Sequence, residues 1–284
     1  PNPLFLRYHG SSSKNFSFNM LDLNHNLNEI IDLLADFRPD FIVNFAAQGM
    51  VVQSWEKPGD WFQTNAVAMI KLHDSLRKFD WIKRYIHIST PEVYGSCKGL
   101  VKEDHPFNPS TPYAVSRTAA DLSLRTYINA YKFPVVFTRA ANVYGEHQQL
   151  YRIIPRAIIY FLTNKKLQLH GGGTSVRSFI HIDDVCVGTQ RATELGKTGE
   201  VFHFASSQNI SIHSLVVNIA KRMNVRFDDH VEISGDRLGK DSAYLLDCSL
   251  AMHRLNWQPK ISLEEGIDRV IDWVSGNLEE LVNQ

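Results

Sequence analysis

The alternation of strand-like and helix-like segments in the first half of the chain is the feature that most constrains its fold. Apolar runs rich in β-branched and aromatic residues are separated by longer stretches in which apolar residues recur at helical spacing. The predicted strands are residues 40–47, 84–89 and 134–145, and the predicted helices are 26–37, 59–79 and 112–131. Strands that alternate with helices in this way predict an α/β fold with a parallel, doubly wound sheet.

The second half of the chain is less regular, and its elements are shorter. We predict helices at residues 151–166, 211–223 and 262–278 and strands at 167–173, 177–185 and 200–205, in addition to a short strand at 15–20. The length of 284 residues suits one large domain or two small ones. We therefore place a soft boundary near residue 146, with a mixed α/β part after it.

Composition excludes several classes of function. The formal net charge is zero, so no overall charge favours nucleic acid or an anionic membrane. The 12 histidines are scattered without metal-ligand spacing, so no metal site is expected. No apolar stretch approaches the roughly 20 residues of a membrane span. The three cysteines (Cys97, Cys186 and Cys248) are odd in number and far apart, which suits a reducing, cytoplasmic environment.

The stretch "STPEVYGS" (89–96) follows the predicted strand 84–89 and is rich in polar groups. Open α/β sheets bind ligands beyond the carboxyl ends of their strands, so this position predicts a site. In extended geometry Thr90 and Glu92 would face the same side. The alternatives are that Thr90 only bonds backbone at a strand end and that Glu92 is a solvated loop acid. Tyr94 and Gly95 are assigned to closing the turn.

A second candidate pair lies on the helix predicted at residues 112–131. Tyr113 and Arg117 are four residues apart and therefore share one helix face. A cation close to a tyrosine favours the phenolate and lowers the pKa of the phenol. A phenolate beside a sugar or alcohol hydroxyl can act as a general base. Taken alone, a surface tyrosine next to a solvated arginine explains the pair equally simply.

Segments spread in order over nearly the whole chain resemble a known family. They are residues 38–48, 89–96, 111–122, 138–145 and 171–185, with weaker similarity at 236–247 and 255–267. These segments are similar to the extended short-chain dehydrogenase/reductase family, in its group of NAD-dependent epimerases and dehydratases. The most similar members are the NDP-hexose 4,6-dehydratases, of which the dTDP-glucose enzymes are the best-known type. The resemblance implies a Rossmann-type NAD-binding domain at residues 1–145 and a nucleotide-sugar-binding part at 146–284, with segments returning to the first domain.

The resemblance also implies a reaction and roles for the catalytic candidates. Tyr113, paired with Arg117, would take the proton of the sugar 4-hydroxyl while hydride passes from C4 to NAD, and Thr90 would hydrogen-bond that hydroxyl. Glu92 would then remove the C5 proton, water would leave from C6 and hydride would return to C6. The product would be a 4-keto-6-deoxy sugar, and NAD would be regenerated.

Further residues would bind the cofactor and the substrate by the same resemblance. Those implied for NAD are Asp22, Leu23, Ala46, Ala47, Gln48, Asn65, Tyr113 and Arg117, and those implied for the nucleotide sugar are Asn142, Arg177 and Arg237. Arginine suits a diphosphate because its planar fork donates paired hydrogen bonds. Asp22 and Asn142 could instead serve only as turn residues, and either arginine could form a surface salt bridge.

The chain departs from the family pattern at three places. Arg117 stands where the family has lysine, and Pro91 stands where dTDP-type dehydratases have the aspartate that protonates the leaving hydroxyl. No glycine-rich GxxGxxG turn precedes residue 22, so the sequence is expected to begin about one βαβ unit inside the cofactor domain. A UDP-glucuronate decarboxylase, an NDP-sugar 4-epimerase and a non-catalytic relative that binds nucleotide sugars therefore remain alternatives. The family also implies a homodimer built from a bundle of the helices 59–79 and 112–131.

Overall fold

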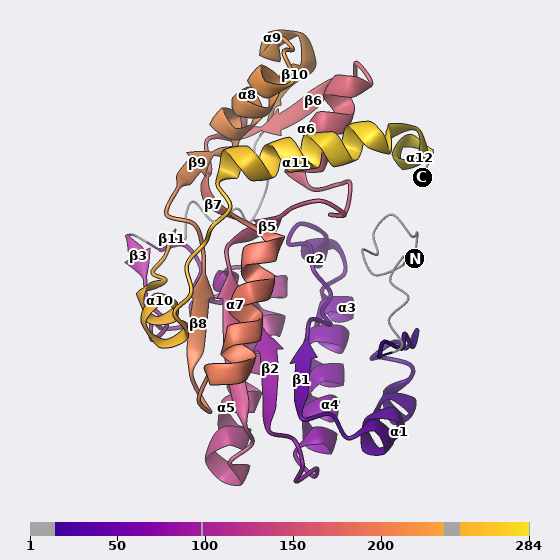
Figure 1. Cartoon of the computed structure of the whole chain (residues 1–284), viewed down its shortest axis with the longest axis vertical. Helices are drawn as coiled ribbons and strands as arrows, with labels where there is room; N and C mark the ends of the chain where they lie inside the picture. Colours follow the sequence, from indigo (N-terminus) through magenta and orange to yellow (C-terminus); the bar gives the residue numbers. More distant parts are fainter. Residues whose placement is uncertain (1–14, 98, 236–244, 284) are drawn as a thin grey trace.

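A four-stranded parallel sheet forms the centre of the computed structural model, which describes residues 15–97, 99–235 and 245–283. Its strands lie in the order β1-β2-β4-β8 (Figure 1). They are β1 (Phe41–Asn44), β2 (Arg84–Ile88), β4 (Val135–Ala140) and β8 (Val201–Phe204). All neighbouring pairs run parallel, so the four carboxyl ends meet at one edge of the sheet. The predicted α/β fold with a parallel sheet is confirmed.

One face of this sheet is covered by helices from the first half of the chain. They are α3 (Pro58–Phe62), a π-helical turn (Gln63–Ala68), α4 (Met69–Leu76) and α5 (Pro112–Tyr131). Met69, Leu76 and Leu124 from these helices are fully buried against Tyr85 and Val135 of the sheet. The single helix predicted at 59–79 is therefore wrong in detail, because a π-helical turn interrupts it and α4 ends at Leu76.

The other face is covered by α7 (Ile182–Leu195), with α10 (Ser249–Leu255) beside it (Figure 1). Close packing requires glycine on α7, since a Cβ added at Gly188 would lie 2.7 Å from the ring of Phe204. The Phe204 ring in turn packs against Trp257, with ring centroids 4.7 Å apart. A chain segment that follows residue 146 thus completes the sheet and its second helical layer.

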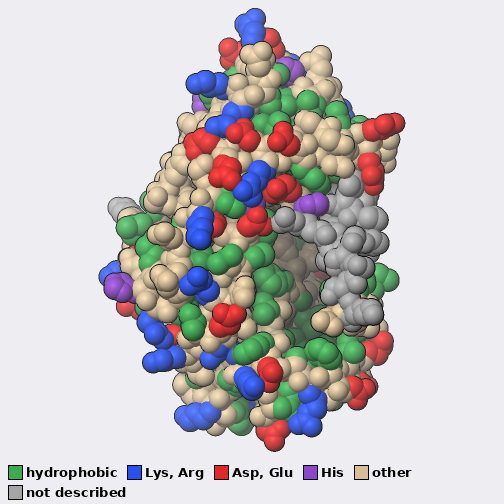
Figure 2. Space-filling view, in the orientation of Figure 1, with side chains coloured by type: hydrophobic (Ala, Val, Ile, Leu, Met, Phe, Trp, Pro, Cys, Tyr) green, Lys and Arg blue, Asp and Glu red, His purple; other side chains and the backbone are tan. Residues whose placement is uncertain are grey.

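The free edge of the sheet is apolar. The residues of the predicted strand 40–47 are typical of a buried strand, but β1 has one strand neighbour among the described residues, and Phe41 and Val43 are 43% and 39% exposed. Residues 16–22 form no regular strand, so the strand predicted at 15–20 is wrong. A strand needs a neighbour for its backbone hydrogen bonds, and among the described residues only β2 pairs with β1. Figure 2 shows hydrophobic side chains around a recess on the face that carries α7.

A second apolar cluster lies at the carboxyl end of the sheet. It is formed mainly by α6 (Ile153–Leu162), α8 (Ile212–Arg222) and α11 (Leu263–Gly276), which pack together through buried aliphatic residues (Figure 1). Ser211 and Ser262 cap α8 and α11, accepting backbone N–H groups at 3.0 and 3.1 Å. Serine is a preferred N-cap residue, because its side-chain oxygen satisfies a backbone N–H of the first helical turn.

Within the described residues, short strands form three smaller sheets outside the central sheet. The three-stranded sheet is β5 (Asn142–Tyr144), β7 (Val176–His181) and β9 (Asn209–Ser211); the two-stranded ones are β6 (Leu167–His170) with β10 (Val231–Ser234) and β3 (Leu100–Val101) with β11 (Leu245–Leu246). The remaining helices are α1 (Leu27–Phe37), α2 (Gln53–Glu56), α9 (Phe227–His230) and α12 (Leu278–Val282). Of the helices in the described part of the chain, none combines the length and the apolar character that crossing a membrane requires.

A buried carboxylate fastens the C-terminal segment to α7. Asp184 lies in the first turn of α7, and its two oxygens accept the backbone N–H groups of Lys260 and Ile261, each at 3.0 Å. The indole of Trp257 donates to the Asp184 carbonyl at 2.9 Å. One side chain therefore satisfies two amides of the loop that precedes α11, and it fixes how the two parts of the chain meet.

We expect Asp184→Asn to lower the free energy of unfolding by about 2–3 kcal/mol, because one loop amide would face an NH₂ group in place of a charged acceptor. The adjacent Asp183→Asn is the matched control. Asp183 has a side chain that is 36% exposed and pairs with Arg269 at 3.4 Å, so we expect a loss below about 1 kcal/mol. Urea unfolding followed by tryptophan fluorescence measures both. Equal losses of unfolding free energy in the two variants would show that the loop hydrogen bonds of Asp184 stabilise the fold no more than the exposed Asp183 does.

Candidate active site

The carboxyl end of β2 leads directly into a tight 3-10 turn, Pro91–Tyr94. Thr90 caps this turn, and its hydroxyl accepts the backbone N–H of Glu92 at 3.3 Å. Pro91 occupies the first turn, where its fixed φ suits the geometry and no backbone N–H is required. Thr90 is buried, whereas Glu92 is partly exposed. The turn therefore presents a carboxylate at the edge of the sheet where ligands of α/β proteins bind.

Tyr113 lies in the first turn of α5, and its position is set by the cap of that helix. Thr111 accepts the backbone N–H of Ala114 at 3.1 Å, and Pro112 follows it. The Tyr113 side chain forms a hydrogen bond with the Thr90 side chain, and the charge of Glu92 acts on it. The Tyr113 and Thr90 side chains thus meet, and Glu92 lies near enough for its charge to act on the phenol.

The pKa of Tyr113 contradicts the expectation drawn from its spacing to Arg117. Burial raises the pKa of the phenol above its usual value, and the nearby Glu92 carboxylate raises it further. Arg117, the Thr90 hydrogen bond and Arg152 lower it, but they do not compensate. The predicted lowered pKa is therefore wrong for this structure, because desolvation and a like charge outweigh the cations.

Arg117 is buried, and its guanidinium lies beneath β2. One of its Nη atoms donates to the carbonyl oxygen of Ile88, the last residue of that strand. Its positive charge contributes to lowering the pKa of His73 and of His87, after the larger contribution of burial. Its Nε and other Nη atoms have no hydrogen-bond partner within the described residues. A buried donor without an acceptor is costly, so these two atoms mark a place where a ligand oxygen would be stabilising.

The loop after β1 is fixed to α5 by a single amide side chain. Asn65, buried in the π-helical turn, accepts the backbone N–H of Gln48 at 2.8 Å and donates to the Gln48 carbonyl at 2.9 Å. It also donates to Ser116 of α5 at 3.0 Å. Ala46 and Ala47 are exposed at the same edge. π-Helical turns inside helices often occur at functional sites, and this one holds the predicted cofactor loop in place.

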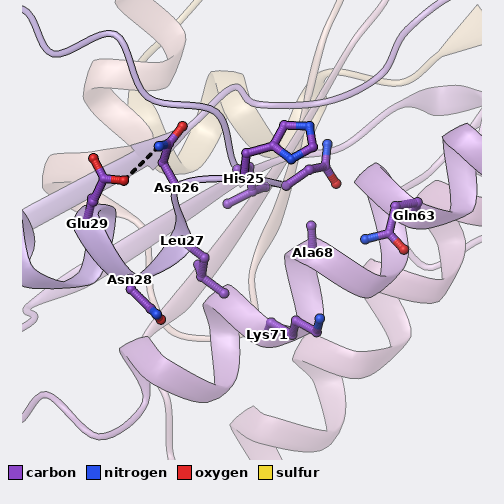
Figure 3. A pocket seen from close by; sticks show the side chains of 10 residues that line it. His25, Asn26, Leu27, Asn28, Glu29, Gln63, Ala68 and Lys71 are labelled. Atoms are coloured by element: carbon purple, nitrogen blue, oxygen red, sulfur yellow. Dashed lines mark hydrogen bonds between the residues drawn. The ribbon is translucent and has the colours of Figure 1, made fainter.

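A pocket of about 380 Å³ lies beside the segment implied for adenine binding (Figure 3). Leu23, Ala68 and the stem of Lys71 line it together with polar side chains such as Gln63. Asp22 forms the turn at its entrance, since its carboxylate accepts the Asn24 backbone N–H at 2.7 Å. This is the turn role that the sequence left open for Asp22.

The donor and acceptor groups of these sites suit part of a dinucleotide. The buried Oδ1 atom of Asn24 beside the pocket has no partner within the described residues, and neither have the two donors of Arg117. The mainly polar lining of the pocket suits the ring nitrogens and amino group of a purine, and ribose hydroxyls match unpaired guanidinium donors. NAD therefore fits the residues that are present.

The predicted substrate residues lie on neighbouring strands. Asn142 begins β5 and pairs in register with Phe179 of β7, two residues after Arg177. Both side chains are partly exposed, and an Arg177 Nη atom donates to the Val176 carbonyl at 2.9 Å. Arg237 lies outside the described residues. The structure thus brings Asn142 and Arg177 to the same small sheet.

Sequence reasoning missed Arg152, which immediately precedes α6. Its positive charge lowers the pKa of Tyr113, as the smallest of the five contributions to that pKa. Arg152 is exposed and 39 positions distant in sequence from Tyr113, so no local pattern relates the two. Only the fold shows that a second cation, besides Arg117, belongs to the neighbourhood of Tyr113.

The parallel sheet and the side chains at its carboxyl edge define a Rossmann-type enzyme of the short-chain dehydrogenase/reductase class. A family model described as GDP-mannose 4,6 dehydratase matches residues 5–270. The chain belongs to this family. A curated relative, the dTDP-glucose 4,6-dehydratase of Streptomyces antibioticus, is 34% identical over 239 residues, which cover 84% of this chain and 71% of the relative.

Solved structures give the same result. A dTDP-glucose 4,6-dehydratase from Streptomyces venezuelae with NAD bound superposes with a TM-score of 0.88 at 29% identity, covering 95% of this chain and 83% of that one. A UDP-glucuronic acid 4-epimerase from Bacillus cereus, in complex with UDP-glucuronic acid and NAD, superposes with a TM-score of 0.86 at 28% identity, covering 93% of this chain and 83% of that one. The Rossmann-type fold and the family resemblance are confirmed.

We expect Glu92→Gln to lower the pKa of Tyr113, because the substitution removes a negative charge that disfavours the phenolate. The measurement is an alkaline absorbance titration of Glu92→Gln and of the parent protein. Subtracting the same titration of each protein with Tyr113→Phe added isolates this one phenol. Glu146→Gln is the control, since Glu146 does not contribute to the pKa of Tyr113. An unchanged Tyr113 titration in Glu92→Gln would contradict the proximity of the two groups.

Proposed function

We propose that this protein catalyses the NAD-dependent dehydration of a nucleotide-activated hexose to its 4-keto-6-deoxy form. The observation that carries the proposal is the convergence of Thr90, Glu92 and Tyr113 at one strand end. The dTDP-glucose 4,6-dehydratases at about a third sequence identity support it. When bound, NAD supplies the acceptor for the C4 hydrogen and later returns hydrogen to C6.

The residues of the chain perform the proton transfers. Tyr113 takes the proton of the sugar 4-hydroxyl, and Thr90, already hydrogen-bonded to the phenol, orients that hydroxyl. The C4 ketone acidifies the C5–H bond, and Glu92 removes that proton. Pro91 cannot protonate the leaving 6-hydroxyl. Glu92 therefore passes the proton that it has taken from C5 to the hydroxyl, which leaves as water. When hydride returns to C6, C5 takes up a proton from solvent, and Tyr113 releases to solvent the proton that it took from the 4-hydroxyl.

The other residues hold the ligands in this proposal. Leu23, Asp22 and the loop Ala46–Gln48, fixed by Asn65, bind NAD, and the free donors of Arg117 reach its ribose. Asn142 and Arg177 bind the sugar or its diphosphate, as does Arg237. The sequence segments before and after residue 146 serve cofactor and substrate, respectively. A cytoplasmic location suits an enzyme that uses nucleotide sugars.

A 4-epimerase or decarboxylase on the same scaffold is the second candidate, favoured by one observation. The Bacillus cereus 4-epimerase superposes nearly as well as the dehydratases, and Pro91 removes one acid that dTDP-type dehydratases use. An epimerase needs Tyr113 but has no step for a carboxylate at C5. Glu92, directed to the same point as Tyr113, therefore favours dehydration.

Product analysis with Glu92→Gln tests the function. Wild-type enzyme loaded with NAD is incubated with dTDP-glucose, UDP-glucose, GDP-mannose and UDP-glucuronate, quenched with borodeuteride and analysed by mass spectrometry. We expect a 4-keto-6-deoxy sugar from one of the hexoses. In Glu92→Gln we expect its formation to fall by about 10²–10⁴-fold, while a 4-keto sugar that retains its 6-hydroxyl is trapped.

The alternatives give different products in the same assay. An inverted C4 with an intact 6-hydroxyl would indicate an epimerase, and loss of CO₂ from UDP-glucuronate would indicate a decarboxylase. No reaction with any of these substrates, together with no NAD in the purified protein, would indicate a binding protein. Any of these results would replace the proposed dehydratase activity.

We propose in addition that the protein forms a homodimer through its α3–α5 helical layer. Apolar side chains on this layer are directed to solvent: Phe62 37%, Val67 42%, Ile70 37%, Val115 40% and Leu122 49% exposed. Two copies of such a face, related by a two-fold axis, would bury these residues in an intermolecular helix bundle. The face is large enough to expect a partner, because monomers rarely expose contiguous apolar patches of this kind.

We expect Leu122→Glu to shift the protein from dimer to monomer, because it places a charge in the centre of the proposed bundle. Leu195→Glu is the matched control, since Leu195 is 51% exposed but ends α7 on the opposite face of the sheet. Sedimentation velocity measures both variants. A dimer that survives Leu122→Glu but is lost in Leu195→Glu would place the interface on the other face.

A further inference from the structure

The phenol of Tyr94 is the least expected feature near the candidate active site. Tyr94 ends the 3-10 turn that carries Glu92, and its side chain is fully buried. Its hydroxyl contacts His203 Nε2 at 2.8 Å, a guanidinium nitrogen of Arg139, and the Glu103 carbonyl at 3.4 Å. Closing a turn does not require a phenol that three other segments hold.

The hydrogen bonds of this phenol have a defined direction. Arg139 can only donate, so the phenol oxygen accepts from it. Burial lowers the pKa of His203 to about 3, so its ring is neutral at neutral pH. His203 Nδ1 lies 3.2 Å from the Asp247 carbonyl and therefore donates, which leaves Nε2 to accept the Tyr94 proton. A phenol bonded on both sides in this way has a single orientation.

Arg139 extends this chain of contacts to the catalytic helix. Its guanidinium lies 4.8 Å from the centre of the Tyr94 ring and donates to Asp121 of α5 at 2.7 Å. Ser89, at the end of β2, donates to the same Asp121 oxygen at 2.8 Å. Arg139 and Asp121 have no solvent-exposed side-chain surface, and buried charge-assisted contacts of this kind are short and rigid. The end of the Glu92 turn is thus tied to α5.

The backbone around Glu92 is held at both ends. Thr90 caps the start of the turn, while the Val93 carbonyl accepts the Asn108 N–H at 2.9 Å. Gly95 follows with φ +66°, and a Cβ there would lie 2.1 Å from the Asn108 carbonyl oxygen. The backbone after Tyr94 is thus packed closely against Asn108, and the contacts of the phenol tie the end of the turn to Arg139 and His203.

We propose that Tyr94 is a positioning residue: anchored by Arg139 and His203, it holds Glu92 at the distance from Tyr113 that proton removal at C5 requires. The inference deepens the proposed function and rests on it for its catalytic part. Tyr113 does not depend on the Tyr94 hydroxyl itself, because the Thr111 cap, the contact between Arg117 and Ile88 and the Arg139–Asp121 pair hold its helix without that hydroxyl. Loss of the Tyr94 hydroxyl should therefore affect Glu92 selectively.

The first test needs neither substrate nor cofactor. The effect of Glu92→Gln on the pKa of Tyr113 measures how close the two groups are. We expect this effect to shrink when Tyr94→Phe is also present, because the turn relaxes and moves the carboxylate away. Tyr144→Phe is the matched control: Tyr144 is equally buried, and its hydroxyl donates to the Ser262 and Leu263 carbonyls, away from the turn. An undiminished effect in Tyr94→Phe would overturn the inference, whatever the enzyme does.

The second test separates two steps of the reaction. Rapid quenching with borodeuteride measures the C4 ketone that retains its 6-hydroxyl and the 6-deoxy product, per folded protein determined by unfolding titration. For Tyr94→Phe we expect C4 oxidation within about three-fold of wild type and conversion to product about ten- to a hundred-fold slower. Simple destabilisation lowers both steps equally, and that result would overturn the inference. Absence of a C4 ketone in the wild type would reject the proposed function, and the first test would still decide the role of Tyr94.

Discussion

The buried carboxylate of Asp121 is the constraint on which the geometry of the site depends. Moving a carboxylate out of water costs several kcal/mol, and the protein recovers that only if every partner is in place. Asp121 accepts from Ser89 at 2.8 Å and from Arg139 at 2.7 Å, and His87 lies 3.2 Å away. Burial alone would raise the pKa of Asp121, but Arg139 and His87 hold it far below the usual range.

This constraint fixes the distance between the two catalytic segments. Asp121 lies eight residues after Tyr113 on α5, which corresponds to about 12 Å along the helix. Its partners are at the end of β2 and in β4, so α5 cannot slide along the sheet without separating buried charges. Tyr113, at the amino end of α5, is thereby held beside Thr90 by an interaction two helical turns away. Contacts in the middle of α5 therefore position this helix, and its amino end, which carries Tyr113, stays accessible to a ligand.

The raised pKa of Tyr113 follows from the same arrangement. In the proposed reaction Glu92 must lie close to C5 of the sugar while Tyr113 lies close to the oxygen on C4. Two groups that serve adjacent atoms of one ring cannot be far apart, so the carboxylate necessarily disfavours the phenolate. Arg117 and Arg152 oppose this effect through space. At neutral pH the phenol is therefore mostly protonated, and in the proposed reaction it can take the 4-hydroxyl proton only as the phenolate, which the raised pKa makes a stronger base.

Local sequence signals predicted the elements whose ends are determined by their own residues. The bounds of α5 coincide with the predicted 112–131, because Thr111 and Pro112 cap and start the helix. The apolar sequence of β1 predicts a strand, but the burial of that strand depends on neighbours that its own sequence does not contain. The π-helical turn was missed because one inserted residue hardly changes helical periodicity over a short window.

In the candidate site, too, some features follow from local sequence and others only from the fold. Spacing placed Tyr113 and Arg117 on one helix face, but it could not show that a long side chain would turn beneath β2 to reach Ile88. The contacts of Tyr94 with Arg139 and His203 join positions 45 and 109 residues apart in sequence. In the sequence, buried polar residues of this kind cannot be distinguished from ordinary strand residues, because their contacts exist only in the assembled sheet. Sequence therefore predicted which groups are candidates for the reaction, and only the fold showed what holds them.

Pro91 explains why the position of Glu92 matters more in this chain than in a dehydratase with two acids. Where an aspartate precedes the glutamate, one acid can remove the C5 proton while the other protonates the leaving hydroxyl. With Pro91 in that place, Glu92 must serve both atoms in the proposed reaction. Both must then lie on the side of the ring that faces the 3-10 turn. Proline removes a proton donor but stiffens the start of this turn, while Thr90 and Tyr94 fix its two ends. A single carboxylate with two tasks tolerates little movement, and the rigidity of the turn meets that requirement.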